Sequence, residues 1–193
     1  MPTDRSWTRD FCPLFVKAGA GSDGAITNLK FNGWGKYPNH KKDDAVNDWL
    51  AKRLRRKQWR PTLGTGRGAR RIVLEGGSID VNGKGTLLTT EECLLSPTQA
   101  RNPGVSRADL ERAIGEHLGI RKVLWLGNGI AGDDTHGHVD DLARFVDRET
   151  VVLVADADPA DVVTLRGAGL KVDAFAGPRS ETTRPPPEQQ QSP

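Results

Sequence analysis

The sequence predicts an α/β fold assembled from one repeated unit of two strands, a helix and a third strand. Three observations support this prediction. The order strand, strand, helix, strand can be followed over residues 10–74, again over residues 75–126, and in a shorter form over residues 138–177. Apolar residues recur at helical spacing in the helical segments of the first two units. A polar cluster precedes the first extended segment of each unit. Repetition of one supersecondary unit indicates a cyclic or stacked array.

The first unit opens with two extended segments, at 10–16 (DFCPLFV) and 25–35 (AITNLKFNGWG), which the glycine-rich stretch 17–24 connects. Residues 43–59 are expected to form a helix, because apolar side chains recur at helical spacing and aspartates stand at its start. A strand at 71–74 is expected to close the unit.

The second unit is expected to begin with a hairpin around the turn NGKG, since asparagine and glycine favour tight turns between strands. Its second strand is expected to run through residues 85–95 and so to include Cys93. A helix is then expected from the N-cap Ser106 to the stop signal Gly119. The apolar stretch KVLWL at 122–126 is expected to be the closing strand.

The third unit is shorter. The apolar spacing of residues 138–146 (HVDDLARFV) fits a strand and a helix equally well. Residues 150–157 predict a strand, residues 159–169 a weak helix, and residues 170–177 a closing strand. The segment that follows, residues 178–193, has almost no apolar side chains and contains a proline triplet, which predicts a disordered Pro/Gln-rich tail.

The composition is that of a globular chain with balanced charge. Its 28 basic and 25 acidic residues leave a net charge of +3, which does not by itself argue for nucleic acid. The basic runs at 52–60 and 67–71 leave a nucleic-acid patch open as an alternative to a solvated helix face. No apolar run is long enough to cross a membrane, and no secretory signal is visible. Cys12 and Cys93 form no CxxC pair, so we expect a cytoplasmic setting, with neither nucleic acid nor a membrane as partner.

The densest group of ionisable side chains lies at 132–141 (GDDTHGHVDD), with four aspartates and two histidines. Three interpretations stay open. In an extended chain, alternate side chains from Asp134 to Asp140 share one face and could hold a divalent metal, although no CxxC or HExxH motif supports this. A solvated acidic loop explains the aspartates but not the histidines. In a cation clamp, carboxylates hold a planar guanidinium and raise the pKa of a histidine, which serves as acid and then as base.

Two other polar clusters precede the first strands of their units. WTRD, which ends at Asp10, offers an aromatic face and a carboxylate, or only ordinary packing and a surface ion pair. EGGSI, which begins with Glu75, offers another carboxylate, or only a glycine bend. If the units are related by rotation, the three clusters converge. We therefore expect Asp10, Glu75 and Asp140 to lie together, with His138 between or beside them.

Four stretches together resemble the agmatine deiminase family and its close kin, the bacterial peptidylarginine deiminases. They are WTRDFCPLFV, FNGWGK, VLEGGSIDVNGKGTLLTTEECLLSPTQARNP and VLWLGNGIAGDDTHGHVDDLARFV. The resemblance runs, in the family's order, from about residue 5 to about residue 155. The family fold is a five-bladed α/β propeller, the pentein fold, built from ββαβ units. The resemblance therefore implies a partial pentein-type propeller of about three of five units, as one deiminase domain over residues 1–177.

The resemblance also implies a reaction. A hydrolase of this family converts a guanidinium to a ureido group and releases ammonia, with agmatine as substrate, N-carbamoylputrescine as product and no cofactor, in putrescine and polyamine biosynthesis. A cysteine thiolate attacks the guanidinium carbon, and a histidine protonates the leaving ammonia and then activates water. Carried over by motif, the catalytic residues are His138, Asp140 and Asp10, and the substrate-binding residues are Trp7, Asp134 and Glu75.

The sequence departs from the family at the nucleophile, because the motif GGGNIHC that carries the thiolate does not occur. Cys93 is expected to be buried packing. Cys12 follows Asp10 by two residues on an extended segment, so it is expected to share a side with Asp10 without the angle for attack. We therefore expect a truncated member that binds guanidines with little turnover and whose open sheet edge promotes homo-oligomers. The alternatives are a non-catalytic guanidine-binding remnant, a peptidylarginine deiminase and a metal-dependent hydrolase.

Overall fold

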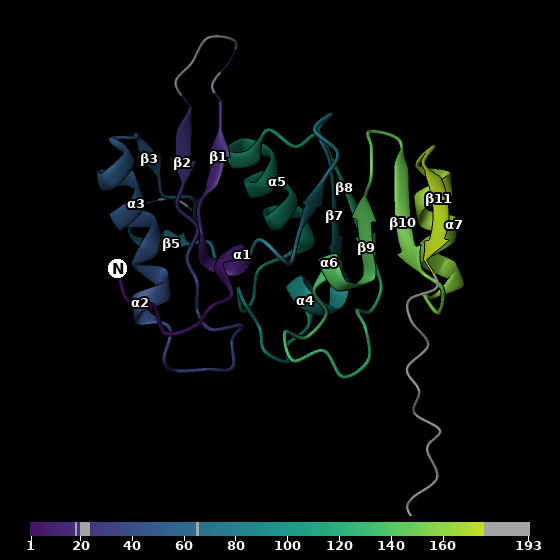
Figure 1. Cartoon of the computed structure of the whole chain (residues 1–193), viewed down its shortest axis with the longest axis horizontal. Coiled ribbons are helices and arrows are strands. Elements are labelled where there is room, and N and C mark those ends of the chain that lie inside the picture. Colours follow the sequence, from purple (N-terminus) through teal and green to yellow (C-terminus); the bar gives the residue numbers. More distant parts are fainter. Residues whose placement is uncertain (18, 20–23, 65, 176–193) are drawn as a thin grey trace, which may run out of the picture.

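Among the described residues, three sheets of three strands stand side by side along the long axis of the molecule, with helices packed between and around them and one separate two-stranded sheet (Figure 1). The structure is a computed structural model, and it describes residues 1–17, 19, 24–64 and 66–175. The expected α/β class is confirmed, but the sheets of the described residues do not join into one closed sheet. The expected tail, residues 178–193, lies outside the described residues, as does most of the connection at 17–24.

All three sheets share one strand order. The first strand pairs antiparallel with the second, and the second pairs parallel with the third after a helical crossover. The strands are β1 (Leu14–Val16), β2 (Ala25–Thr27) and β3 (Gln58–Trp59) in the first sheet, β6 (Asp80–Val81), β7 (Thr86–Thr90) and β8 (Lys122–Leu126) in the second, and β9 (Ala143–Phe145), β10 (Thr150–Val154) and β11 (Lys171–Phe175) in the third. The predicted repetition of one unit is confirmed by this shared order.

Helices fill the crossovers, and single helical turns precede two of the first strands. The crossover helices are α2 (Lys41–Asp44) and α3 (Val46–Leu54), α4 (Glu91–Leu95) and α5 (Arg107–Leu118), and α7 (Pro159–Gly167). The turns are α1 (Thr8–Phe11) before β1 and α6 (Val139–Leu142) before β9. Helix α5 begins and ends as predicted, because Ser106 Oγ accepts from the Asp109 N–H at 3.1 Å and Gly119 adopts a left-handed φ of 69°. Among the described residues, no helix has the length and apolar character needed to cross a bilayer.

The first unit closes differently from the prediction. Helix α3 ends at Leu54, because Arg55 adopts a left-handed φ of 52° and turns the chain. Residues 58–59 then leave the expected helix and form β3, the parallel partner of β2. The closing strand expected at 71–74 forms only in part: β5 (Arg70–Arg71) pairs antiparallel with β4 (Thr62–Leu63), across the short 3-10 turn at Gly66–Gly68, whereas Val73 makes an isolated parallel bridge with Lys30, just after β2. This hairpin divides the closing segment into two parts.

Three other expected strands also begin or end in a helical turn. Residues 10–16 open within α1 before they reach β1. The strand expected through 85–95 stops at Thr90, whose side chain accepts from the Cys93 N–H at 3.1 Å and so begins α4 as an N-cap. Residues 138–146, which fitted a strand and a helix equally, form both, as α6 and then β9.

Separate apolar clusters support the units. The largest lies between α5 and the second sheet and includes Leu87 and Leu110. Another lies between α7 and the third sheet and includes Leu153 and Leu165. A small, mainly aromatic cluster beside α1 contains Phe31. The two larger clusters each include residues of neighbouring units, such as Leu74 beside Leu87 in the first and Leu124 beside Leu153 in the second, so they hold successive units against one another.

Candidate active site

The segments that precede β1, β6 and β9 meet near α1 and α6 (Figure 1). The backbone N–H of Gly77 donates to Asp10 Oδ1 at 3.0 Å, and the backbone N–H of Asp140 donates to the Gly77 carbonyl at 3.2 Å. The backbone N–H of Gly76 donates to the Asp10 carbonyl at 3.4 Å. Main-chain hydrogen bonds thus join the three polar clusters, and their predicted convergence is confirmed.

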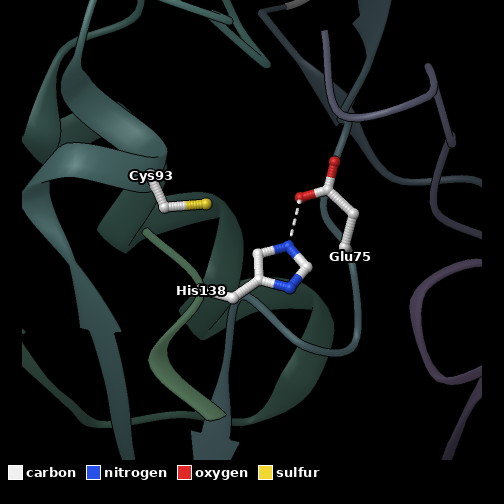
Figure 2. Close-up of side chains that lie close together, drawn as sticks. All are labelled: Glu75, Cys93 and His138. Atoms are coloured by element: carbon white, nitrogen blue, oxygen red, sulfur yellow. Dashed lines mark ion pairs between the residues drawn. The ribbon is translucent and has the colours of Figure 1, made fainter. Parts of the chain in front are cut away.

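The imidazole of His138 lies among three carboxylates. Its Nδ1 lies 3.8 Å from Asp10 Oδ1 and 3.9 Å from Asp140 Oδ1. Its Nε2 lies 3.6 Å from Glu75 Oε2, the contact drawn in Figure 2. His138 is only 3% exposed. The prediction that these four side chains lie together is confirmed as geometry, while the roles assigned to them stay predictions.

A tight loop presents His138 to this cluster. His136 and Gly137 both have left-handed backbone conformations, with φ of 61° and 90°. Asp133 closes the loop, because its Oδ2 accepts from the backbone N–H groups of Gly137 at 3.0 Å and of His138 at 3.1 Å. Asp133 therefore binds the backbone of its own loop, and it is not one of the alternate residues from Asp134 to Asp140 that suggested a metal site.

Gly77 allows the clusters to approach this closely. A Cβ added to Gly77 would lie 2.5 Å from His138 Nδ1 and 2.7 Å from Asp10 Oδ1, closer than real side chains pack. A Cβ at Gly76 would lie 2.0 Å from the Arg9 carbonyl oxygen. The two glycines of EGGSI are thus more than a bend, because only residues without a side chain fit between the first and third clusters.

Glu75 is held by an ion pair that sequence reasoning missed. Both its side chain and that of Arg101 are fully buried, and Arg101 Nε lies 3.1 and 3.2 Å from the two Glu75 carboxylate oxygens. The guanidinium also donates to the carbonyls of Gln99, at 3.1 Å, and Thr135. Arg101 therefore ties Glu75 to the loop that carries His138. It stands in the stretch TQARNP, where the sequence offered no local signal for a partner 26 residues away.

The other two carboxylates have partners of their own. Trp34 Nε1 donates to Asp10 Oδ2 at 3.1 Å, which fixes the carboxylate that Gly77 also binds. Asp140 Oδ2 lies 3.3 Å from Nε of Arg9, whose side chain is 47% exposed. Asp140 therefore already pairs with a guanidinium supplied by the chain, at the surface side of the cluster.

The buried charges shift one another's pKa values. Burial raises the pKa of Asp10, and the His138 cation only partly offsets this. Burial alone would raise the pKa of Glu75, but Arg101 and then His138 hold it below its usual value. Burial alone would lower the pKa of His138, but the carboxylates of Glu75 and then Asp10 raise it above its usual value. The site thus favours a histidine cation facing the Glu75 carboxylate.

Two of the predicted site residues lie apart from this cluster. Asp134 is exposed and pairs with Lys36 Nζ, while it accepts from the Tyr37 hydroxyl at 2.7 Å. Trp7, just before α1, is 64% exposed. The structure therefore does not bring Asp134 or Trp7 into contact with His138.

Cys93 is buried beside the cluster. The prediction of a buried packing role agrees with its 0% exposure and its place in the main apolar cluster, although it lies in helix α4 and not in a strand. Burial, followed by the charge of Glu75, raises the pKa of its thiol. Its sulfur nevertheless comes within 4.8 Å of one ligand atom of Glu75 and one of His138, and this trio could hold a metal ion.

Cys12 is not arranged as predicted relative to Asp10. Asp10 belongs to the helical turn α1, and Cys12 is its C-cap, so the extended spacing that would align their side chains is absent. The half-buried thiol of Cys12 instead lines a cavity of about 750 Å³ together with Leu14, Phe15 and Ile79. Burial raises the pKa of this thiol too, so neither cysteine is activated as a thiolate.

Comparisons with known proteins show which family the sequence is similar to. A family profile described as Porphyromonas-type peptidyl-arginine deiminase matches residues 1–168. An agmatine deiminase of Pseudomonas fluorescens is 38% identical over 166 residues, which cover 83% of this chain and 42% of that relative. The chain therefore spans about two fifths of the length of such curated relatives.

Solved structures give the same result. The structure titled as agmatine deiminase of Enterococcus faecalis catalysing its reaction superposes with a TM-score of 0.76 at 33% identity, over 91% of this chain and 50% of that one. A C. jejuni agmatine deiminase with substrate bound superposes with a TM-score of 0.74 at 30% identity, over 90% of this chain and 51% of that one. The mixed α/β arrangement of small sheets is therefore shared with these enzymes.

Proposed function

The chain belongs to the Porphyromonas-type peptidyl-arginine deiminase family, and from that premise we propose that its buried cluster is the guanidinium site of an agmatine deiminase-type hydrolase. The observation that carries the proposal is His138 surrounded by Asp10, Glu75 and Asp140. The proposed ligand is agmatine, which the reaction of this class of hydrolase converts to N-carbamoylputrescine and ammonia.

The carboxylates are suited to a planar cation. A guanidinium presents hydrogen-bond donors along its edges, and each such bond to a desolvated carboxylate is worth about 1.5–3 kcal/mol. Asp10 is 8% exposed, and each of its oxygens already accepts one hydrogen bond, so each has a lone pair left. Asp140 already pairs with the Arg9 guanidinium, which supports its affinity for this group. We propose that these two residues hold the substrate guanidinium.

His138 is suited to move protons. With its pKa raised, the ring is a cation that can donate a proton to the leaving ammonia. Where a thiolate has attacked the guanidinium carbon, the neutral ring can accept a proton from the water that hydrolyses the thioether intermediate. Glu75 stabilises the cationic form through its ion pair, and Arg101 keeps Glu75 in place. We propose His138 as the acid and base and Glu75 as a residue of the substrate site.

We propose that this chain binds guanidines without converting them to products. The attack needs a thiolate, yet Cys93 is buried in α4 and burial raises the pKa of both the Cys93 and the Cys12 thiol. A second candidate function is a guanidine-binding protein without catalysis. It shares with the deiminase the first step, binding of the guanidinium by the carboxylates. Trp7 and Asp134 are proposed to contact the substrate at the rim, which would require them to move toward the cluster.

We propose a partial pentein-type propeller, with residues 1–177 as one domain, as the finer description of the fold. The shared strand order of the three sheets and the convergence of their polar segments support it. Homo-oligomers are part of this proposal, because the outer strands β1 and β11 of their sheets are paired on one side only among the described residues. The two free cysteines support a cytoplasmic setting.

Titration calorimetry with agmatine tests the binding step, with putrescine as the matched ligand that has no guanidinium. Agmatine should bind wild type, and Asp10→Asn and Asp140→Asn should weaken binding at least tenfold, since each removes a charged partner. An ammonia assay on the same samples should stay at background. Equal binding of putrescine and agmatine would overturn the proposed site, and ammonia release that disappears in Cys12→Ser would make Cys12 the nucleophile.

A further inference from the structure

Three buried side chains from different parts of the chain bring possible metal ligands together. Glu75 precedes β6, Cys93 lies in α4, and His138 precedes α6. They offer one ligand atom each, and these atoms all lie within 4.8 Å of one another. In Figure 2 the Cys93 sulfur lies to the upper left of the His138 ring and the Glu75 carboxylate to its upper right. The proposed guanidine chemistry gives Cys93 no task.

The second observation is an unpartnered nitrogen. His138 Nε2 is buried and has no hydrogen-bond partner among the described residues, since Glu75 Oε2 at 3.6 Å is beyond hydrogen-bond length. Buried polar atoms without a partner are uncommon in folded proteins and call for an explanation. A metal ion bound between His138, Glu75 and Cys93, whose ligand atoms lie within 4.8 Å of one another, would be the partner of this nitrogen.

We propose that Glu75, Cys93 and His138 form a binding site for Zn²⁺ or a similar borderline-soft divalent cation. Thiolate, imidazole and carboxylate are the ligands that zinc takes in proteins, whereas Mg²⁺ and Ca²⁺ select oxygen ligands. Three protein ligands leave a fourth position for water. Zinc bonds of about 2.0–2.3 Å place tetrahedral ligands roughly 3.4–3.8 Å apart, so the trio must contract by about 1 Å.

The surrounding charges suit a divalent cation. Asp10 and Glu75 are negative and Arg101 is positive, so the buried cluster carries one negative charge before His138 is counted. A Cys93 thiolate makes this two negative charges, which one divalent cation balances. Arg101 does not block the site, because each Glu75 oxygen that receives Arg101 Nε has a lone pair left. On binding, the thiol proton and any proton on Nε2 pass to solvent, and nothing is oxidised or reduced.

The site would regulate the proposed guanidine chemistry. A metal on His138 Nε2 prevents that nitrogen from carrying a proton, and a cation beside Glu75 and Asp10 repels a guanidinium. This consequence rests on the proposed function, whereas metal binding itself does not. Zinc is therefore expected to compete with agmatine.

The test uses the full chain without an affinity tag and Co²⁺ as a spectroscopic probe, displaced by Zn²⁺. Wild type should show a sulfur-to-cobalt charge-transfer band at one equivalent of metal. Cys93→Ser should lose the band and bind Zn²⁺ at least tenfold more weakly, while the matched control Cys12→Ser should keep both. A band that survives Cys93→Ser, or that disappears in Cys12→Ser, would refute the site.

A measurement on wild type covers the case in which Cys93→Ser fails to fold. In a ring-nitrogen NMR spectrum, Zn²⁺ should shift the His138 Nε2 resonance and leave those of His136 in place; a shift confined to His136 contradicts the inference. Agmatine titration separates the two proposals. Agmatine binding without metal binding refutes the zinc site alone, and metal binding without agmatine binding refutes the guanidine site alone.

Discussion

Two pairs of opposite charges, Glu75 with Arg101 and Asp134 with Lys36, have similar chemistry and opposite surroundings. Both side chains of the first pair are 0% exposed, whereas those of Asp134 and Lys36 are 60% and 42% exposed. Each pair joins segments that are distant in sequence. The first pair fixes the Glu75 carboxylate, which lies 3.6 Å from His138 Nε2. The second pair lies at the surface and includes Asp134, a residue of the loop that carries His138.

The difference shows that burial, and not the presence of an ion pair, decides what a charge does here. A buried pair that loses one partner leaves an uncompensated charge without water. An exposed pair exchanges its partner for solvent and salt ions. Substitutions in the buried pair should therefore cost much more stability than substitutions in the exposed pair.

Arg101→Met should lower the free energy of unfolding by about 3–5 kcal/mol, because Glu75 is then buried without its counter-charge. Urea unfolding followed by circular dichroism measures it. Lys36→Met is the matched control at the exposed pair and should unfold at the wild-type urea midpoint. The double variant Glu75→Gln/Arg101→Met should recover part of the loss, since no unpaired charge remains. Equal midpoints for Arg101→Met and Lys36→Met would contradict the contrast.

Gly77→Ala should have the next largest effect, about 1–3 kcal/mol of destabilisation, because its Cβ would lie 2.5 Å from His138 Nδ1. The displacement of His138 and Asp10 should also weaken agmatine binding. Gly68→Ala is the control, since a Cβ there meets nothing within 4 Å. If both variants bind agmatine as wild type does, the close approach at Gly77 does not position the site.

Local signals made much of the fold predictable. The cap at Ser106, the stop at Gly119 and the turn NGKG act within a few residues, so α5 and the second hairpin follow from the sequence. The elements whose bounds were predicted wrongly, α3 and the strand before α4, depend on backbone conformations that the residue types do not indicate. Arg55 ends α3 in a left-handed conformation, which arginine seldom adopts. Thr90 is the N-cap of α4, although the residues around it have the pattern of a strand.

The part of the site that follows from the repeated unit could be predicted from the sequence. Polar clusters before each first strand implied that Asp10, Glu75 and His138 converge. The partners of these residues were not predictable, because Arg101 reaches Glu75 only through tertiary packing. The position of Asp134 was not predictable either, since its loop bends at His136 and Gly137, and alternation along an extended chain does not apply there.

The pH dependence of stability should show the charge state of His138. Burial opposes the cation, but Glu75 and then Asp10 raise the pKa of His138 above its ordinary 6.5 in the folded chain. A raised folded pKa stabilises the fold fully below the unfolded pKa, and this contribution is lost as pH rises through the folded value. The stability difference between wild type and His138→Gln should therefore shrink as pH rises above 6.5. A difference that grows over that range would show that His138 is buried in its neutral form.

Asp134→Asn should have the smallest effect, and it tests whether the exposed pair belongs to the site at all. The carboxylate is held by Lys36 and Tyr37 at the surface, so its loss should leave the urea midpoint unchanged. If Asp134 binds the cationic end of agmatine at the rim, affinity should fall about two- to fivefold in low salt and return to the wild-type value in high salt, because exposed charges are screened. Asp10→Asn should weaken binding at both salt concentrations, since Asp10 is buried. A salt-independent loss in Asp134→Asn as large as that in Asp10→Asn would mean that the loop closes over the ligand and buries Asp134, in which case the contrast between the two pairs holds only for the free chain.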